Sequence, residues 1–208
     1  MKGYYFITDA SLSRAGNLSD VAQAMAAGVR VVQYRQKQGR LPDLVAEARQ
    51  LRRLCRHNLF LINDRVDVAL EVEADGIHLG QEDLSCLEAR NLLGPDKIIG
   101  VTVHDLSEAL AAQAGGADYL GVSPIFSTAT KADAGLPAGV ALVAAIRRRV
   151  SIPLVAIGGI TLDNAPAVIG AGADMVCAIS AVVTKAEVQR EIEKFQTLFH
   201  NKISEKFG

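Results

Sequence analysis

The sequence has few aromatic residues and few cysteines. Phe, Trp and Tyr together make up 5% of its 208 residues, and Trp is absent. Half of the residues are nonetheless apolar, so the core is expected to consist of Ala, Val, Ile and Leu, as where helices pack against a buried parallel sheet. Cys55, Cys86 and Cys177 are widely spaced and odd in number, which fits neither a disulfide framework nor a metal-knuckle pattern. A reducing compartment is therefore expected.

The sequence also shows no excess of one charge, no signal-peptide pattern and no run that predicts a membrane helix. Lys and Arg number 22 and Asp and Glu number 23, giving a net charge of −1, so no global basic field favours nucleic acid. The first residues, MKGYYFITD, lack the apolar stretch and the cleavage site of a signal peptide. No apolar run approaches the ~20 residues that a membrane helix needs. We expect a cytoplasmic protein that binds neither nucleic acid nor membrane.

Short β-branched runs alternate with amphipathic segments along the whole chain. Apolar residues three and four apart predict helices between the runs, for example over 41–57 and 106–116, with a final helix near 184–200. The eight runs begin at residues 4, 29, 59, 75, 97, 118, 153 and 175. Eight such units favour an α/β fold closed into a (β/α)8 TIM barrel. The open-sheet alternative usually carries a GxGxxG turn after its first strand, and ITDASLSRAG stands there instead.

No Pro-rich or Gly/Ser-rich linker divides the sequence. Domains mostly split only beyond ~250 residues, so residues 1–208 are predicted to form a single barrel domain. Barrel enzymes keep their chemistry in the loops that follow the strands. The catalytic face is therefore expected at the carboxyl ends of the strands.

Polar residues and glycines follow six of the eight predicted strands. In chain order they are Gln33, Arg35 and Lys37; Asn63 and Asp64; Gln81 and Asp83; Ser123, Thr128, Thr130 and Lys131; Gly158 and Gly159; and Ser180. Any one of them has an ordinary structural explanation as a solvated or ion-paired residue. Six strand ends together favour a functional site.

The charges of these residues predict a diphosphate and a divalent cation. Arg35, Lys37 and Lys131 complement the spread negative charge of phosphate oxygens. Asp64 and Asp83 would repel the same anion, unless a cation lies between them. Mg²⁺ binds through one or two carboxylates together with substrate phosphates, so a diphosphate–Mg²⁺ site is expected. Glycines 158 and 159 predict a second phosphate site after the seventh strand.

Other roles for the same residues remain open from the sequence. Asp64 could pair with Arg65, Asp83 could cap a helix that begins near residue 84 or 85, and the two carboxylates could form an acid/base pair. Thr128 and Thr130 could be turn hydroxyls.

The histidines and serines give weaker signals. His78 lies inside an apolar run, where a hydrogen-bonded core imidazole is the simpler interpretation and a place on the site floor the alternative. His104 follows the fifth predicted strand and could reach the mouth. No HxH, HExxH or GxSxG pattern occurs, so neither zinc nor a covalent serine mechanism is expected.

Five segments together resemble the thiamine phosphate synthase family. They are QYRQK at 33, LINDRVDVALEVEADGIHLGQEDL at 61, ADYLGVSPIFSTATKADAG at 117, IPLVAIGGIT at 152 and AISA at 178. The resemblance runs from the first predicted strand to the last. It implies a (β/α)8 barrel that joins an aminopyrimidine diphosphate to a thiazole phosphate and releases pyrophosphate with Mg²⁺.

Carried over position by position, the resemblance also implies roles for individual residues. The pyrimidine diphosphate would be held by Gln33, Arg35, Lys37 and Asn63, and Mg²⁺ by Asp64 and Asp83. The departing pyrophosphate would bind Lys131 and the Thr102 hydroxyl, with Arg35, Lys37 and Lys131 as the catalytic cations. The thiazole phosphate would be held by Thr128, Thr130, Gly159, Ile179 and Ser180.

The chain departs from the family pattern at a few positions, and two other functions remain open. Thr102, Ser123 and Ser127 stand where the family usually has Ser, Gly and Pro, and Met175 and Cys177 stand where small residues are common. These changes bear on substrate preference. The alternatives are a thiazole tautomerase on the same barrel and a non-catalytic phosphate-binding regulator. The oligomeric state is open, with a homo-oligomer as one possibility.

Overall fold

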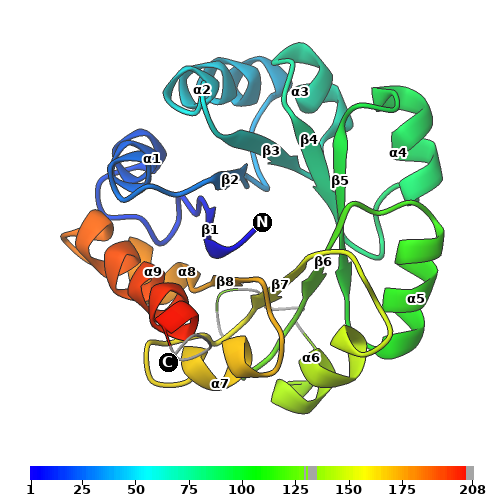
Figure 1. Ribbon diagram of the computed structural model, residues 1–208. Helices are drawn as coiled ribbons and strands as arrows, with labels where there is room; N and C mark the ends of the chain where they lie inside the picture. Colours follow the sequence, from blue (N-terminus) through cyan, green and yellow to red (C-terminus); the bar gives the residue numbers. More distant parts are fainter. Residues whose placement is uncertain (129, 131–134, 205–208) are drawn as a thin grey trace.

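Eight parallel strands close into a barrel in strand order β1 to β8. The computed structural model describes residues 1–128, 130 and 135–204, with only the backbone for 200–204. The strands are β1 Gly3–Ile7, β2 Val31–Tyr34, β3 Leu59–Asn63, β4 Gly76–Leu79, β5 Ile98–Val103, β6 Tyr119–Val122, β7 Leu154–Ile157 and β8 Met175–Cys177. All eight strands predicted from the sequence are present, and the predicted (β/α)8 barrel is confirmed (Figure 1).

Helices surround the barrel on the outside (Figure 1). They are α1 Asn17–Ala26, α2 Leu41–Leu54, α3 Val66–Glu71, α4 Cys86–Leu93, α5 Leu106–Ala114, α6 Gly139–Arg147, α7 Ala165–Gly170, α8 Ile179–Val183 and α9 Val188–Ser204. None of the described helices is long and apolar enough to cross a bilayer.

The end of the chain differs from the prediction. Instead of one helix near 184–200, a short α8 precedes α9, which begins at Val188. Thr184 directly follows α8, and its hydroxyl donates a 2.7 Å hydrogen bond to the Ser180 carbonyl. Bonds of this kind slightly destabilise a helix and often bend it.

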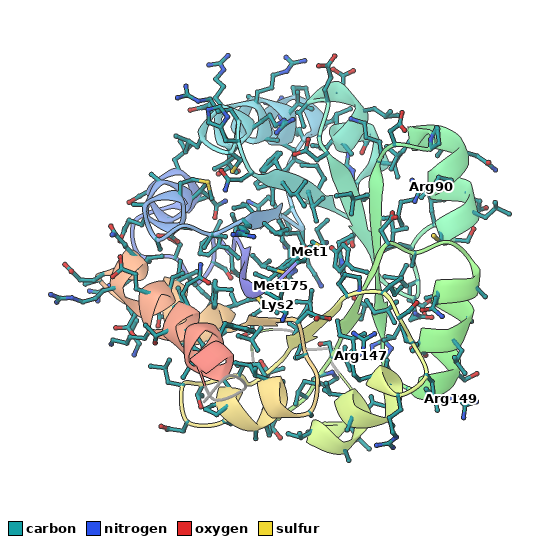
Figure 2. All side chains as sticks on the ribbon, viewed as in Figure 1. Met1, Lys2, Arg90, Arg147, Arg149 and Met175 are labelled. Carbon is teal, nitrogen blue, oxygen red and sulfur yellow. The ribbon has the colours of Figure 1, made fainter. Side chains whose placement is uncertain are left out.

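Apolar side chains fill two concentric regions. The larger cluster lies between the strands and the helices, and a smaller one, which includes Tyr5, Leu61, Tyr119 and Met175, fills the barrel interior. Figure 2 shows Met175 close to the barrel axis, near Met1 and Lys2. Because the interior is packed, ligands can enter only at an end of the barrel.

Three Arg–Asp ion pairs tie helices to strands at the amino-terminal end of the barrel. Each Asp precedes an even-numbered strand, pairs with an Arg of the helix two units before it, and also accepts a backbone N–H from the preceding strand. The sets are Asp75, Arg52 and Phe60; Asp118, Arg90 and Ile99; and Asp174, Arg147 and Leu154. We call these three sets the clamps.

The clamp before β2 is replaced by a contact from the last helix. Arg30 occupies the position equivalent to Asp75, since its carbonyl accepts the Leu59 N–H as the Asp75 carbonyl accepts that of Ile98. The N–H of Tyr4 instead donates to Oε1 of Gln196 in α9 at 3.3 Å. The side chain of Gln196 thus takes the place of the missing carboxylate.

Replacing Asp75 with Ala should destabilise the fold. Its carboxylate accepts two hydrogen bonds from Arg52, at 3.0 and 2.8 Å, and one from the Phe60 N–H at 2.8 Å. Losing these bonds at a half-buried position is expected to lower the free energy of unfolding by about 2 kcal/mol. Urea denaturation would measure the change.

Asp43→Ala is the matched control, because Asp43 pairs with Arg40 where both side chains are more than half exposed. Asp43→Ala should lower the free energy of unfolding by less than about 1 kcal/mol. Equal losses for the two variants would show that the clamp adds nothing to an ordinary surface pair.

Candidate active site

A cavity of about 320 Å³ opens at the carboxyl ends of the strands. Residues at or just beyond the ends of all eight strands contribute to its wall. The site residues predicted from the sequence that line it are Gln33, Arg35, Lys37, Asn63, Asp64, Asp83, Thr102, Thr128, Thr130, Gly159, Ile179 and Ser180. Lys131 lies outside the described residues. The sequence thus predicted where these residues gather; their roles are a separate question.

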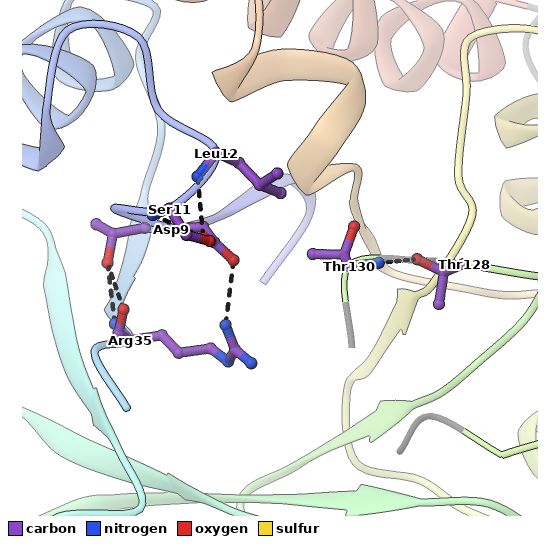
Figure 3. A network of polar contacts seen from close by, with 7 residues as sticks. Asp9, Ser11, Leu12, Arg35, Thr128 and Thr130 are labelled. Atoms are coloured by element: carbon purple, nitrogen blue, oxygen red, sulfur yellow. Dashed lines mark hydrogen bonds and ion pairs between the residues drawn. The ribbon is translucent and has the colours of Figure 1, made fainter. Parts of the chain in front are cut away.

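Arg35 is held in the cavity by the loop that follows β1. Its guanidinium donates to Asp9 Oδ2 at 3.2 Å, and its backbone N–H donates to the Thr8 hydroxyl at 2.9 Å. Asp9 is buried and also accepts hydrogen bonds from Ser11 and Leu12 (Figure 3). The guanidinium is therefore fixed in direction before any anion binds.

Sequence reasoning missed Asp9 and Thr8. Both residues directly follow β1, which is the position that singled out polar residues after six other strands. The same criterion, applied to ITD at the end of the first predicted strand, would have found them. Their contact with Arg35 could not be read from the sequence.

Asp64 and Asp83 face the cavity close to one another. Asp64 has a left-handed backbone conformation, φ 60°, which is uncommon outside glycine and is typical of functional positions. Burial first, and then the neighbouring Asp83 carboxylate, raise the pKa of Asp64 to about 7, although Arg35 opposes the shift. Two carboxylates held together in a half-buried position are unfavourable unless a cation or a proton neutralises them.

Two of the alternatives for these carboxylates, the Asp64–Arg65 ion pair and the Asp83 helix cap, are wrong. Arg65 pairs with Asp67, with Nε 2.8 Å from Oδ1, rather than with Asp64. The cap of α4 is Ser85, whose side chain accepts the Glu88 N–H. Asp83 instead accepts the Gly80 N–H at 2.6 Å, which fixes its carboxylate at the cavity wall.

The carboxylate pair suits a magnesium ion better than a metal held by the protein alone. In the described part of the chain, no group of three or more His, Cys, Asp or Glu residues could hold a metal. Mg²⁺ commonly takes one or two carboxylates and completes its shell with waters and substrate phosphates. Asp64 and Asp83 fit that pattern, and a divalent cation between them would also remove the repulsion that raises the pKa of Asp64.

The opposite wall of the cavity is formed after β6, β7 and β8. Gly159 has φ 62°, and a Cβ there would lie 2.5 Å from the Ser127 carbonyl oxygen, so only glycine fits. Thr128 does act as a turn hydroxyl, accepting the Thr130 N–H at 3.2 Å (Figure 3), but it also lines the cavity. Hydroxyls and close backbone on this wall are suited to a phosphate.

The two histidines near the site differ. His104 does not line the cavity; its Nδ1 lies 3.0 Å from the Glu108 carboxylate, at the start of α5. His78 is buried and hydrogen-bonded in the barrel, and it also lines the cavity floor. Both interpretations of His78 are therefore correct.

Among the residues that depart from the family pattern, Thr102, Ser123 and Cys177 line the cavity. Met175 is fully buried in the barrel interior, and neither it nor Ser127 lines the cavity. Of these five departures from the family pattern, those at Thr102, Ser123 and Cys177 can therefore contact a bound ligand directly.

Comparison with known proteins gives a consistent result. The profile of a family described as Thiamine monophosphate synthase matches residues 4–182. A thiamine-phosphate synthase of Methanosarcina barkeri is 49% identical over 92% of this chain and 88% of its own length. One of Chloroflexus aurantiacus is 48% identical over 93% and 91%. A solved structure, a thiamine phosphate pyrophosphorylase from Pyrococcus furiosus, is 38% identical, with a TM-score of 0.88 over 96% of both chains.

Proposed function

Because the chain belongs to the thiamine monophosphate synthase family, we propose that it joins an aminopyrimidine diphosphate to a thiazole phosphate, forming thiamine phosphate and pyrophosphate with the help of Mg²⁺. The synthase activity follows from the family and from relatives that cover most of the chain. The observation that carries the Mg²⁺ part is the pair Asp64 and Asp83 beside the cation Arg35. Their arrangement suits a diphosphate whose charge is shared between a metal and the protein.

In this proposal the cavity has two ends. Gln33, Arg35, Lys37 and Asn63 hold the pyrimidine diphosphate on the side of β2 and β3, and Thr102 and Lys131 bind the leaving pyrophosphate. Thr128, Thr130, Gly159, Ile179 and Ser180 hold the thiazole phosphate on the side of β6 to β8. The placement of all of these but Lys131 along one cavity supports the proposal.

The chemistry requires charge stabilisation and alignment rather than a protein nucleophile. The carbon–oxygen bond to the diphosphate breaks, and the pyrimidine cation is captured by the thiazole nitrogen. Arg35, Lys37 and Lys131 neutralise the charge that grows on the leaving group, which is the kind of contact that accelerates such reactions most. Bound Mg²⁺ would add positive charge at the same oxygens. The two phosphate ends of the cavity hold carbon and nitrogen in line.

Removing the metal should abolish turnover. The purified protein is mixed with both substrates, and pyrophosphate and thiamine phosphate are measured with Mg²⁺, with EDTA, and with EDTA followed by excess Mg²⁺. Both products should form with Mg²⁺, fall at least about a hundredfold with EDTA, and return on re-addition. Unchanged turnover in EDTA would refute the metal requirement.

The same assay separates the rival functions. A thiazole tautomerase would isomerise the thiazole without forming pyrophosphate, and a regulator would bind ligands without turnover. TATK at 128–131 and Ser123 favour the synthase over the tautomerase, and the relatives are named as synthases. The cytoplasmic location and a homo-oligomeric state stay predictions.

A further inference from the structure

A chain of hydrogen-bonded polar side chains, all buried except Thr102, crosses the barrel interior beneath the cavity. Gln33 Nε2 lies 2.9 Å from Tyr5 Oη, which lies 2.7 Å from Tyr119 Oη. Tyr119 Oη lies 2.8 Å from His78 Nδ1, and His78 Nε2 lies 2.8 Å from Thr102 Oγ1. Both ends of this chain, Gln33 and Thr102, line the cavity, while the two tyrosines are fully buried. We call these five residues the relay.

Two strand glycines make room for the relay. A Cβ at Gly100 would lie 2.0 Å from Tyr119 Cζ, and one at Gly121 would lie 2.9 Å from His78 Cε1. Glycine inside a strand weakens it and usually marks a close approach. The barrel interior is thus shaped around the ring of Tyr119 and the imidazole of His78.

The donors and acceptors give the relay a direction. The Gln33 amide nitrogen can only donate, so Tyr5 accepts from it. Among the residues that the structure describes, the only other contact of the Tyr5 hydroxyl is Tyr119. The Tyr5 proton must therefore go to Tyr119, and the Tyr119 proton to His78 Nδ1. Burial raises the pKa of both tyrosines, so each keeps its proton.

The direction of these bonds determines which nitrogen of His78 carries the proton and where the Thr102 hydroxyl can donate. A neutral imidazole that accepts at Nδ1 carries its proton on Nε2, which donates to Thr102 Oγ1. A proton on Nδ1, alone or in a charged imidazolium, would reverse the Tyr119 contact and leave one of the two tyrosine protons with no acceptor in the described part of the chain. Such a buried unpaired donor is costly. The Thr102 hydroxyl then receives one bond and keeps its own proton for the cavity.

We propose that the relay presents the Thr102 hydroxyl to the cavity as a hydrogen-bond donor for a diphosphate oxygen, with Tyr5, Tyr119 and His78 as positioning residues. This inference rests on the proposed function for the identity of the anion. Each bond in the relay polarises the next, and donation to an ionised oxygen is the stronger kind of hydrogen bond. Side chains inside the barrel, which usually only fill its core, would thereby orient a hydroxyl that binds the ligand.

Nitrogen NMR of the imidazole tests the direction without any catalysis. In protein labelled with ¹⁵N-histidine, the His78 resonances, assigned by their loss in His78→Gln, should show a neutral ring with the proton on Nε2. A proton on Nδ1, or on both nitrogens, at neutral pH would overturn the proposal.

Three Tyr→Phe variants then test the effect on the anion. Tyr119→Phe breaks the relay beside His78, Tyr5→Phe leaves the bonds from Tyr119 to Thr102 in place, and Tyr34→Phe removes a buried hydroxyl that contacts Glu47 outside the barrel interior. With inorganic pyrophosphate and Mg²⁺ as the probe, calorimetry should show about tenfold weaker binding for Tyr119→Phe and a smaller loss for Tyr5→Phe. Tyr34→Phe should bind like the unmodified protein.

Kinetics add a second readout. In Tyr119→Phe, kcat/KM for the pyrimidine diphosphate should fall about tenfold, while KM for the thiazole phosphate changes less than about twofold. Unchanged pyrophosphate binding in a folded Tyr119→Phe protein would overturn the relay. Absence of thiamine phosphate formation by the unmodified protein would overturn the proposed function alone, because the tautomer and pyrophosphate binding still test the relay.

Discussion

Arg35→Ala is expected to lower kcat/KM by about a hundredfold to a thousandfold, the range found when one preorganised donor to a developing anion is removed. The guanidinium is held by Asp9 at 3.2 Å and lies near enough to the Asp64 carboxylate to lower its pKa. Its loss removes positive charge from the leaving pyrophosphate and leaves the buried Asp9 carboxylate without its cation. Steady-state kinetics with saturating Mg²⁺ would measure the change.

Arg40→Ala is the matched control for Arg35→Ala. Arg40 also pairs with an aspartate, Asp43, but its side chain is 83% exposed. Turnover should stay within about twofold of the unmodified protein, since exposed pairs contribute little. Arg35→Lys adds a further comparison, because lysine keeps the charge but not the planar donor geometry. Near-normal kcat/KM for Arg35→Ala would remove Arg35 from the catalytic machinery.

Asp83→Asn is expected to raise the Mg²⁺ concentration needed for half-maximal activity by at least about tenfold to a hundredfold, the range already seen for residues that only support a ligand. The substitution removes one carboxylate charge, while the amide oxygen can still accept the Gly80 N–H. Activity should recover with excess Mg²⁺. A titration of rate against Mg²⁺ would measure the shift.

The same titration distinguishes a metal ligand from a proton donor. If Asp64 and Asp83 form an acid/base pair, Asp83→Asn should shift the pH optimum and leave the Mg²⁺ requirement unchanged, which would contradict the metal site. Asp67→Asn is the control, because this carboxylate pairs with Arg65 at the surface and should leave the Mg²⁺ titration unchanged.

The sequence predicted the barrel and most of the cavity because both follow from local patterns. Eight β-branched runs set the strands, and chain order places the residues after each run at one end of the barrel. The domain limits and the residue roles stay predictions. The final helix begins and ends four residues later than predicted, and the short α8 before it was not predicted, because a helix of five residues is too short to show a periodic pattern.

The contacts between strands could not be predicted. Asp9 holds Arg35 from a loop 26 positions away, and Tyr5 meets Tyr119 across 114 positions. Such pairs depend on strand register and on the direction of each side chain, which a single sequence does not encode in any local pattern. In the sequence, neither tyrosine differs from any other apolar residue of a predicted strand; their contact is visible only in the structure.

The replacement of one clamp by Gln196 has a consequence for the order in which the barrel is completed during synthesis. The Arg–Asp pairs of the three clamps join residues 23 to 28 positions apart, so each can form soon after its own segment leaves the ribosome. The contact from Tyr4 to Gln196 spans 192 positions. The bond that replaces the clamp at the first strand is therefore the last of the four to form, and a nascent chain that stops before α9 lacks it even though β1 can already pair with β2 and β8.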